Sequence, residues 1–110
     1  MLLYVLIISN DKKLIEEARK MAEKANLELR TVKTEDELKK YLEEFRKESQ
    51  NIKVLILVSN DEELDKAKEL AQKMEIDVRT RKVTSPDEAK RWIKEFSEEG
   101  GSLEHHHHHH

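Results

Sequence analysis

Two short polar segments contain the residue types that could bind a metal ion or an anion. Ser9-Asn10-Asp11 and Ser59-Asn60-Asp61 repeat the same three residues, and each follows a strongly apolar run. Carboxylates such as Asp11 and Asp61 are ligands that Mg²⁺ prefers, and the N-terminus of a helix attracts anions. The sequence therefore offers one candidate site, for Mg²⁺ or an anion, with Asp11 and Asp61 as its charged members.

Helix capping gives the same two segments a structural explanation. Ser, Asn and Asp are the preferred N-cap residues, because their side-chain oxygens accept hydrogen bonds from the first amides of a helix, worth about 1 kcal/mol each. The carboxylates of Asp11 and Asp61 would also repel a phosphate. Capping alone explains these residue types, so we expect no catalytic, cofactor-binding or metal-binding residue in the chain.

The composition excludes most other chemistry. The chain of 110 residues has no cysteine, and its six histidines form the run 105–110. Cys-ligated metal centres and catalysis by a thiol or by an imidazole outside that run are therefore excluded. The two glycines, Gly100 and Gly101, adjoin the histidines, which leaves no glycine-rich phosphate loop. We expect no enzyme activity and no cofactor.

Charge and hydropathy argue against nucleic acid and membranes as partners. The formal net charge is −3, with 21 basic and 24 acidic residues, which gives no strong electrostatic reason to expect nucleic acid. The apolar run at residues 1–8 is far shorter than the roughly 20 residues that cross a bilayer. We therefore expect a soluble protein without a targeting signal, located in the cytoplasm of the expression host.

The elements that must position the polar segments begin with four apolar runs. Residues 2–8 (LLYVLII) and 52–58 (IKVLILV) are almost continuously apolar, which is typical of strands buried on both faces. Residues 27–33 (LELRTVK) and 76–83 (IDVRTRKV) alternate with charged side chains, which suits edge strands. The sequence predicts four strands, of which the first and third are central.

Four amphipathic helices are predicted between and after these strands, because apolar residues recur there at helical spacing. The apolar stripes are Leu14, Ile15, Ala18, Met21, Ala22 and Ala25; Leu38, Tyr41, Leu42 and Phe45; Leu64, Ala67, Leu70, Ala71 and Met74; and Ala89, Trp92, Ile93 and Phe96. No surplus apolar stripe remains for a protein partner, so we expect a monomer.

The ends of these helices also follow known patterns, although glycine is missing from them. Capping-box pairs and a proline at the first helical position are found at Thr34 with Glu37, Asn60 with Glu63, and Ser85 with Pro86. At the helix ends we expect Asn26 and Asn51 to adopt the left-handed conformation, which Asn tolerates better than most residues. Only Glu75 is available between Met74 and Ile76, and its residue type explains no turn.

The order of elements predicts the fold class. Alternating strands and helices give an α/β protein, here a three-layer α/β/α sandwich with a four-stranded parallel sheet and two helices on each face. We favour the strand order 2-1-3-4, because it places two of the three consecutive strand pairs side by side; 2-3-1-4 is the alternative. Right-handed crossovers then put helices 1 and 4 on one face and helices 2 and 3 on the other.

An internal repeat defines the domain organisation. Residues 5–14 resemble 54–64, and residues 36–45 resemble 87–96, so each half is a β-α-β-α unit. One unit alone would leave a sheet face uncovered. We therefore predict a single domain at 1–99, with half repeats at about 1–50 and 51–99. Residues 100–110 are expected to be a disordered linker and His-tag.

Together these features resemble computationally designed ideal α/β proteins of the Rossmann 2x2 type. The residues that carry the resemblance are the two Ser-Asn-Asp segments, the helix start Ser85-Pro86-Asp87-Glu88, the closing helix KRWIKEFSEE and the Gly-Ser-Leu-Glu-His tail from Gly101. The resemblance implies a monomeric scaffold, made to test folding rules, with no natural biochemical function. The absence of glycine from the helix ends departs from the usual design rules.

A functional alternative remains open, because receiver domains and flavodoxins are similar in layout. In that case the crevice beyond strands 1 and 3 would use Asp11 and Asp61 to bind an anion or Mg²⁺, as a small binding or receiver-like module. The chain departs from receiver domains in three ways. Asp11 has no acidic neighbour, Asp61 lies beyond a Ser-Asn pair, and a fifth strand with its lysine is missing.

Overall fold

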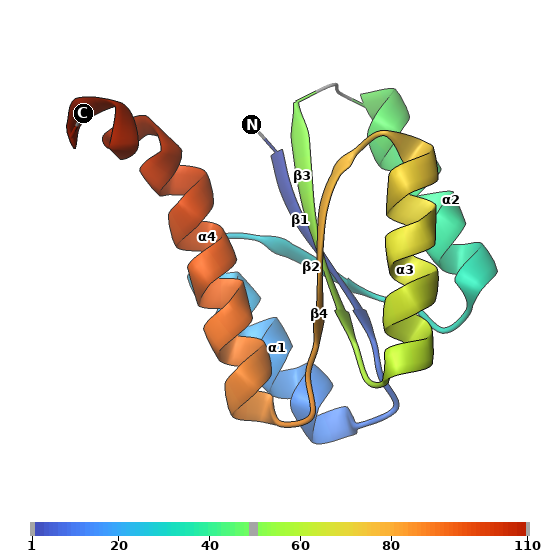
Figure 1. Cartoon of the computed structure of the whole chain (residues 1–110). Helices are drawn as coiled ribbons and strands as arrows, with labels where there is room; N and C mark the ends of the chain where they lie inside the picture. Colours follow the sequence, from blue (N-terminus) through green and yellow to red (C-terminus); the bar gives the residue numbers. More distant parts are fainter. Residues whose placement is uncertain (1, 49–50, 110) are drawn as a thin grey trace.

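The fold was obtained as a computed structural model that describes residues 2–48 and 51–109 (Figure 1). The elements in chain order are β1 (Leu2–Ile8), α1 (Lys12–Lys24), β2 (Glu28–Thr31), α2 (Glu35–Glu48), β3 (Ile52–Val58), α3 (Asp61–Met74), β4 (Asp77–Lys82) and α4 (Pro86–His109). All neighbouring strands are parallel and the sheet order is β2-β1-β3-β4. The favoured strand order is confirmed, and the alternative 2-3-1-4 is wrong.

The helices cover both faces of the sheet in the predicted way. Side chains of α1 and α4 form one buried cluster with β1 and β3, and side chains of α2 and α3 form a second cluster on the other face. Figure 1 shows the resulting three layers, with the sheet in the middle. Among the helices that the structure describes, none has an apolar stretch long enough to cross a lipid bilayer.

The strands β1 and β3 form the centre of the molecule. They pair over their full length, from Leu2 opposite Ile52 to Ile8 opposite Val58. On β1, Leu6 faces α2 and α3, whereas its neighbours Val5 and Ile7 face α1 and α4, and all three are completely buried. Alternation along a strand sends successive side chains to opposite faces, so an unbroken apolar run is what two covered faces require.

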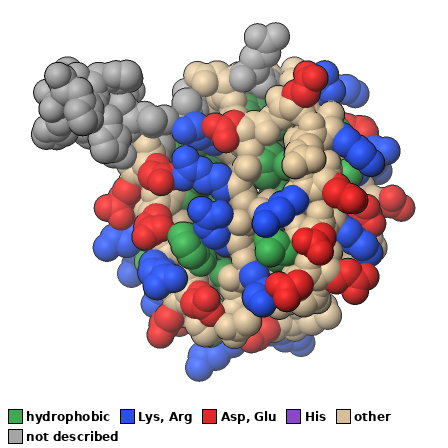
Figure 2. All heavy atoms as spheres, in the orientation of Figure 1, with side chains coloured by type: hydrophobic (Ala, Val, Ile, Leu, Met, Phe, Trp, Pro, Cys, Tyr) green, Lys and Arg blue, Asp and Glu red, His purple; other side chains and the backbone are tan. Residues whose placement is uncertain are grey.

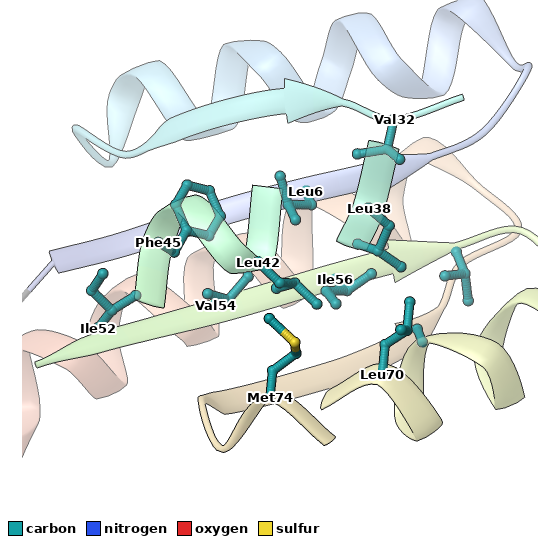
Figure 3. Packing of buried hydrophobic residues seen from close by; sticks show 12 residues of the cluster. Leu6, Val32, Leu38, Leu42, Phe45, Ile52, Val54, Ile56, Leu70 and Met74 are labelled. Carbon is teal, nitrogen blue, oxygen red and sulfur yellow. The ribbon is translucent and has the colours of Figure 1, made fainter. Parts of the chain in front are cut away.

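The layer between the sheet and α2 shows how a helix stripe becomes a core. Figure 3 shows Leu38, Leu42 and Phe45 of α2 on the same side of the sheet as Leu6 and Ile56. These five side chains are at most 3% exposed. Complete burial of a large apolar side chain stabilises a fold by about 1.5–3 kcal/mol. This packing, more than helix propensity, determines where α2 lies.

The end of α1 confirms the predicted role of Asn26. Asn26 has φ of 61°, its N–H donates to the Glu23 carbonyl at 3.1 Å, and the Leu27 N–H donates to the Ala22 carbonyl at 2.8 Å. These two bonds define a Schellman motif, which satisfies carbonyls at a helix end and usually has glycine at the left-handed position. Asn51 directly follows residues 49–50, which lie outside the described residues. The left-handed conformation expected for Asn51 therefore stays a prediction.

Glu75 is the second residue with left-handed backbone, at φ 56° and ψ 34°. Met74 before it is buried, and Ile76 after it packs against the same core cluster. With both neighbours anchored, the single residue between them must reverse the chain direction, whatever its type. Residues with a Cβ adopt this conformation at a cost of about 1–2 kcal/mol relative to the right-handed one.

The helix α4 continues past the predicted domain boundary. We expected a disordered tail from residue 100, whereas the structure has helix up to His109. A helix extends from an existing turn without a new nucleation cost, which accounts for continuation beyond the buried Phe96. Figure 1 shows these last turns projecting away from the sheet. The domain boundary at residue 99 stays a prediction.

Glycine at position 75 should stabilise the protein, because glycine adopts the left-handed conformation without a Cβ penalty. We expect Glu75→Gly to raise the free energy of unfolding by about 1 kcal/mol over that of Glu75→Ala, measured by urea unfolding. Both variants lose the exposed ion pair with Arg46, whose atoms are 4.0 Å apart, so the comparison isolates the backbone. Equal free energies of unfolding for the Gly and Ala variants would contradict the proposed backbone strain at residue 75.

Removal of the tail should leave the fold intact if the domain ends at residue 99. We expect a chain that stops after Glu99 to keep its free energy of unfolding within about 0.5 kcal/mol of the parent, the usual range for changes that remove no packing. Urea unfolding of the two chains provides the measurement. A loss of several kcal/mol would place residues 100–110 inside the cooperative domain.

Candidate functional site

The candidate site lies at the edge of the sheet where the four parallel strands have their carboxyl ends. In open α/β sheets, ligands bind beyond this edge, where neighbouring crossovers leave in opposite directions. Here β1 and β3 are those strands, and the segments that follow them contain Asp11 and Asp61.

Asp11 is the N-cap residue of α1. Its Oδ1 accepts hydrogen bonds from the backbone N–H of Lys13 at 3.1 Å and of Leu14 at 3.2 Å. Its own N–H donates to the Ser9 hydroxyl oxygen at 3.0 Å. The capping explanation is therefore confirmed for this segment, and the Asp11 carboxylate is committed to the start of a helix.

The second segment uses the same three residue types differently. Asn60, not Asp61, is the N-cap of α3, and its Oδ1 accepts from the Glu63 N–H at 2.8 Å. Asp61 is the first residue of the helix, and its Oδ1 lies 3.1 Å from Lys82 Nζ. The Ser59 hydroxyl donates to the Ile8 carbonyl at 2.8 Å and so joins the ends of β3 and β1. Asp11 and Asp61 thus have separate partners, the first amides of α1 and the Lys82 ammonium group.

Glutamates from the first turns of three helices complete this edge. Each accepts a hydrogen bond from the amide of the residue before the N-cap, one residue earlier than in the usual capping box. The donors and acceptors are Lys33 N–H to Glu37 at 2.9 Å, Ser59 N–H to Glu63 at 3.0 Å, and Thr84 N–H to Glu88 at 3.2 Å. These carboxylates satisfy backbone amides that precede each helix, so they too have structural partners.

Hydrogen bonds from Thr84 lower the pKa of the Glu88 carboxyl group. The Thr84 hydroxyl donates to Glu88 Oε1 at 2.6 Å, in addition to the Thr84 amide. These two hydrogen bonds favour the charged form and hold the pKa of Glu88 below its usual value. A general acid that works near neutral pH needs a raised pKa instead, so Glu88 is unsuited to that role.

A small cavity lies between the N-terminal ends of α2 and α3. It encloses about 190 Å³ and is lined by Ile8, Lys33, Thr34, Glu35, Leu38, Glu63 and Lys66. Ligand sites for small molecules are usually about 300–1,000 Å³. Lys66 already interacts with carboxylates, since its Nζ lies 3.4 Å from Glu62 and 3.9 Å from Glu35. Neither Asp11 nor Asp61 lines this cavity.

Within residues 2–48 and 51–99, the structure brings together no group of three or more His, Cys, Asp or Glu side chains that could hold a metal ion. The polar edge is therefore built from single carboxylates, each bonded to a helix start or to a lysine. Sequence reasoning missed the cavity and the second role of each capping glutamate. The spacing of Glu37, Glu63 and Glu88 from their N-caps was the available signal.

Comparison with solved structures gives closely similar proteins. Three de novo designed Rossmann fold proteins are 55%, 56% and 57% identical to this chain, with TM-scores of 0.76, 0.73 and 0.69. The first two alignments cover 89% of this chain and 99% of the other, and the third covers 87% and 98%. No protein-family model and no curated protein matches the chain.

The titration of Glu88 tests the hydrogen bonds at the start of α4. We expect the chemical shift of its side-chain carboxyl carbon, followed by NMR, to have its inflection at a pH below the unfolded pKa of about 4.3. Because the folded pKa is the lower one, Glu88 stabilises the fold at pH above 4.3, and this contribution is lost as the pH falls through the folded pKa.

Thr84→Val removes the hydroxyl donor and should move the inflection of Glu88 up toward 4.3. Thr31→Val serves as the control, because Thr31 lies on β2, the edge strand on the opposite side of the sheet from β4. This substitution should leave the inflection of Glu88 unchanged. An inflection at or above the unfolded value in the parent chain would contradict the hydrogen bonding at this helix start.

Proposed function

Because the chain belongs to the de novo designed Rossmann fold proteins, we propose that it is an idealised folding scaffold with no natural biochemical function. On this proposal it is no enzyme, needs no cofactor and has no obligate partner. The family membership gives the fold and its designed origin. The geometry of the carboxyl edge of the sheet supports the proposal that the chain has no enzyme activity and needs no cofactor.

The single observation that carries the proposal is the use of the polar side chains at the carboxyl edge. Asp11, Asn60, Glu37, Glu63 and Glu88 each accept a hydrogen bond from a backbone amide at a helix start. A catalytic acid, base or metal ligand must instead direct its lone pairs or proton to a reacting atom or ion. The residue types that suggested chemistry are thus employed in specifying where the helices begin.

A monomeric state is part of the same proposal. Within residues 2–48 and 51–99, Leu2 at 45% exposure is the large apolar side chain on the surface, and every other one is at least partly buried. Stable protein interfaces need larger contiguous apolar areas than one side chain provides. The charged residues, 41% of the sequence, dominate the surface in Figure 2.

An ¹⁵N-NMR titration separates this proposal from a receiver-like or anion-binding module. We expect that millimolar MgCl₂ and, separately, millimolar sodium phosphate cause no saturable shift at Ser9, Asp11, Ser59 or Asp61. The reason is that both carboxylates already have partners: Asp11 accepts from two amides of α1, and Asp61 pairs with Lys82.

The matched variant for this titration is Asp11→Asn, because Asn caps a helix about as well as Asp but removes the charge. Asp61→Asn provides the equivalent change in the second segment. Saturable shifts that occur in the parent and vanish in these two variants would overturn the scaffold proposal and establish an ion site at the crevice.

A further inference from the structure

The edge strand β4 presents main-chain groups on the outside of the sheet. The Val83 N–H donates to the Val58 carbonyl at 2.8 Å, so the main chain of Val83 faces β3. Main-chain groups of successive residues in a strand point alternately to its two sides. Val78, Thr80 and Lys82 therefore direct their N–H and C=O groups to the open side, where a further strand could pair.

The Arg81 side chain occupies one of these outward main-chain acceptors. Its Nη1 donates to the Thr80 carbonyl at 2.9 Å, and its guanidinium carbon lies 4.7 Å from the centroid of the Trp92 ring. Cation–π contact with Trp is worth about 0.5–1 kcal/mol at exposed sites and more when water is excluded. Arg81 and Trp92 are both half-buried. Trp92 of α4 thus holds the guanidinium over an acceptor that a new strand would need.

Arg79 lies on the same side of the strand and forms an ion pair with Glu99 of α4. Both arginines line a narrow hollow with Trp92. Figure 2, in which β4 faces the viewer as in Figure 1, shows basic side chains along the α4 side of the strand. The two guanidinium groups therefore lie two residues apart along the open edge, with that of Arg79 paired to Glu99 and that of Arg81 over the Trp92 ring.

A second copy of this chain would bring these charges together. Antiparallel self-pairing of β4 centred on Thr80 would use the outward groups of Val78, Thr80 and Lys82 in both copies, with the two-fold symmetry of most homodimers. This register places Arg79 of each copy opposite Arg81 of the other, at positions without cross-strand hydrogen bonds, where side chains are closest. Like charges directly opposite each other destabilise a strand pair.

We propose that β4 is a latent pairing edge for a second copy of this chain, and that Arg81 keeps it closed. Arg81 does so by bonding to the Thr80 carbonyl and by opposing Arg79 of the second copy. The inference goes beyond the scaffold proposal, because it assigns a specific surface, a register and a residue that controls it.

Reversal of the charge at position 81 should open the edge. Arg81→Glu removes the guanidinium from the Thr80 carbonyl and puts a carboxylate opposite Arg79 of the second copy, twice per dimer. We expect the mass from sedimentation equilibrium to rise from 13.1 kDa toward twice that value, with self-association at least about tenfold tighter than in the parent. Slower hydrogen exchange at the Val78, Thr80 and Lys82 amides should accompany it.

Two variants make the test specific. Arg91→Glu makes the same charge change beside the same ring, since the Arg91 guanidinium lies 5.0 Å from the Trp92 centroid, but α4 does not form the edge, so this variant should associate as the parent does. The double variant R79E/R81E again places like charges opposite each other and should lose the association that Arg81→Glu gains. Far-ultraviolet circular dichroism of each variant confirms that it is folded.

Three results would overturn the inference. These are a folded Arg81→Glu chain that stays monomeric at all concentrations, equal association of Arg91→Glu, and a dimer in which the three β4 amides exchange as fast as in the monomer. The mass of the parent chain tests the proposed monomeric state. Hydrogen exchange at the β4 amides of Arg81→Glu tests only whether β4 is the pairing edge, so the two proposals can fail separately.

Discussion

The pairing of β1 with β3 is the interaction on which the rest of the structure depends. It joins the two β-α-β-α halves along seven-residue strands, and it supplies both buried clusters with their central side chains. Because β1 and β3 are covered on both faces, every helix must contribute an apolar stripe to one of the two layers. Loss of this pairing would leave each half with only two strands and a single helix on each face.

The demand for apolar residues inside leaves the polar ones to the outer faces of the helices, the edge strands, and the points where strands end and helices begin. In the part of the chain that the structure describes, no polar or charged residue falls in the buried class, and no buried side-chain nitrogen or oxygen lacks a hydrogen-bond partner. The polar residues at the carboxyl edge, such as Asp11 and Asn60, therefore have amides as partners. The edge of the sheet that serves as a binding site in other α/β proteins is used here to start helices.

Much of this arrangement could be predicted from the sequence, because patterns of period two and period 3.6 are direct consequences of burial. Strand order and helix faces followed in this way, whereas the role of Asn26 followed from the tolerance of Asn for the left-handed conformation. The different roles of Asp11 and Asp61 depend on a finer signal, since a glutamate stands three residues after Asn60 but Lys13 stands three residues after Asn10. The turn at Glu75 is imposed by its anchored neighbours, and the Arg81 contacts depend on where α4 packs, so neither could be predicted from local sequence.

A thermal unfolding curve, followed by far-ultraviolet circular dichroism, tests most directly whether the residues of this chain are fully committed to a stable fold. When local and global preferences agree throughout a chain, unfolding is cooperative and occurs at high temperature. The account predicts a single sharp transition with its midpoint above the range of about 45–65 °C that is common for mesophilic domains. A broad transition, or a midpoint inside that range, would contradict it.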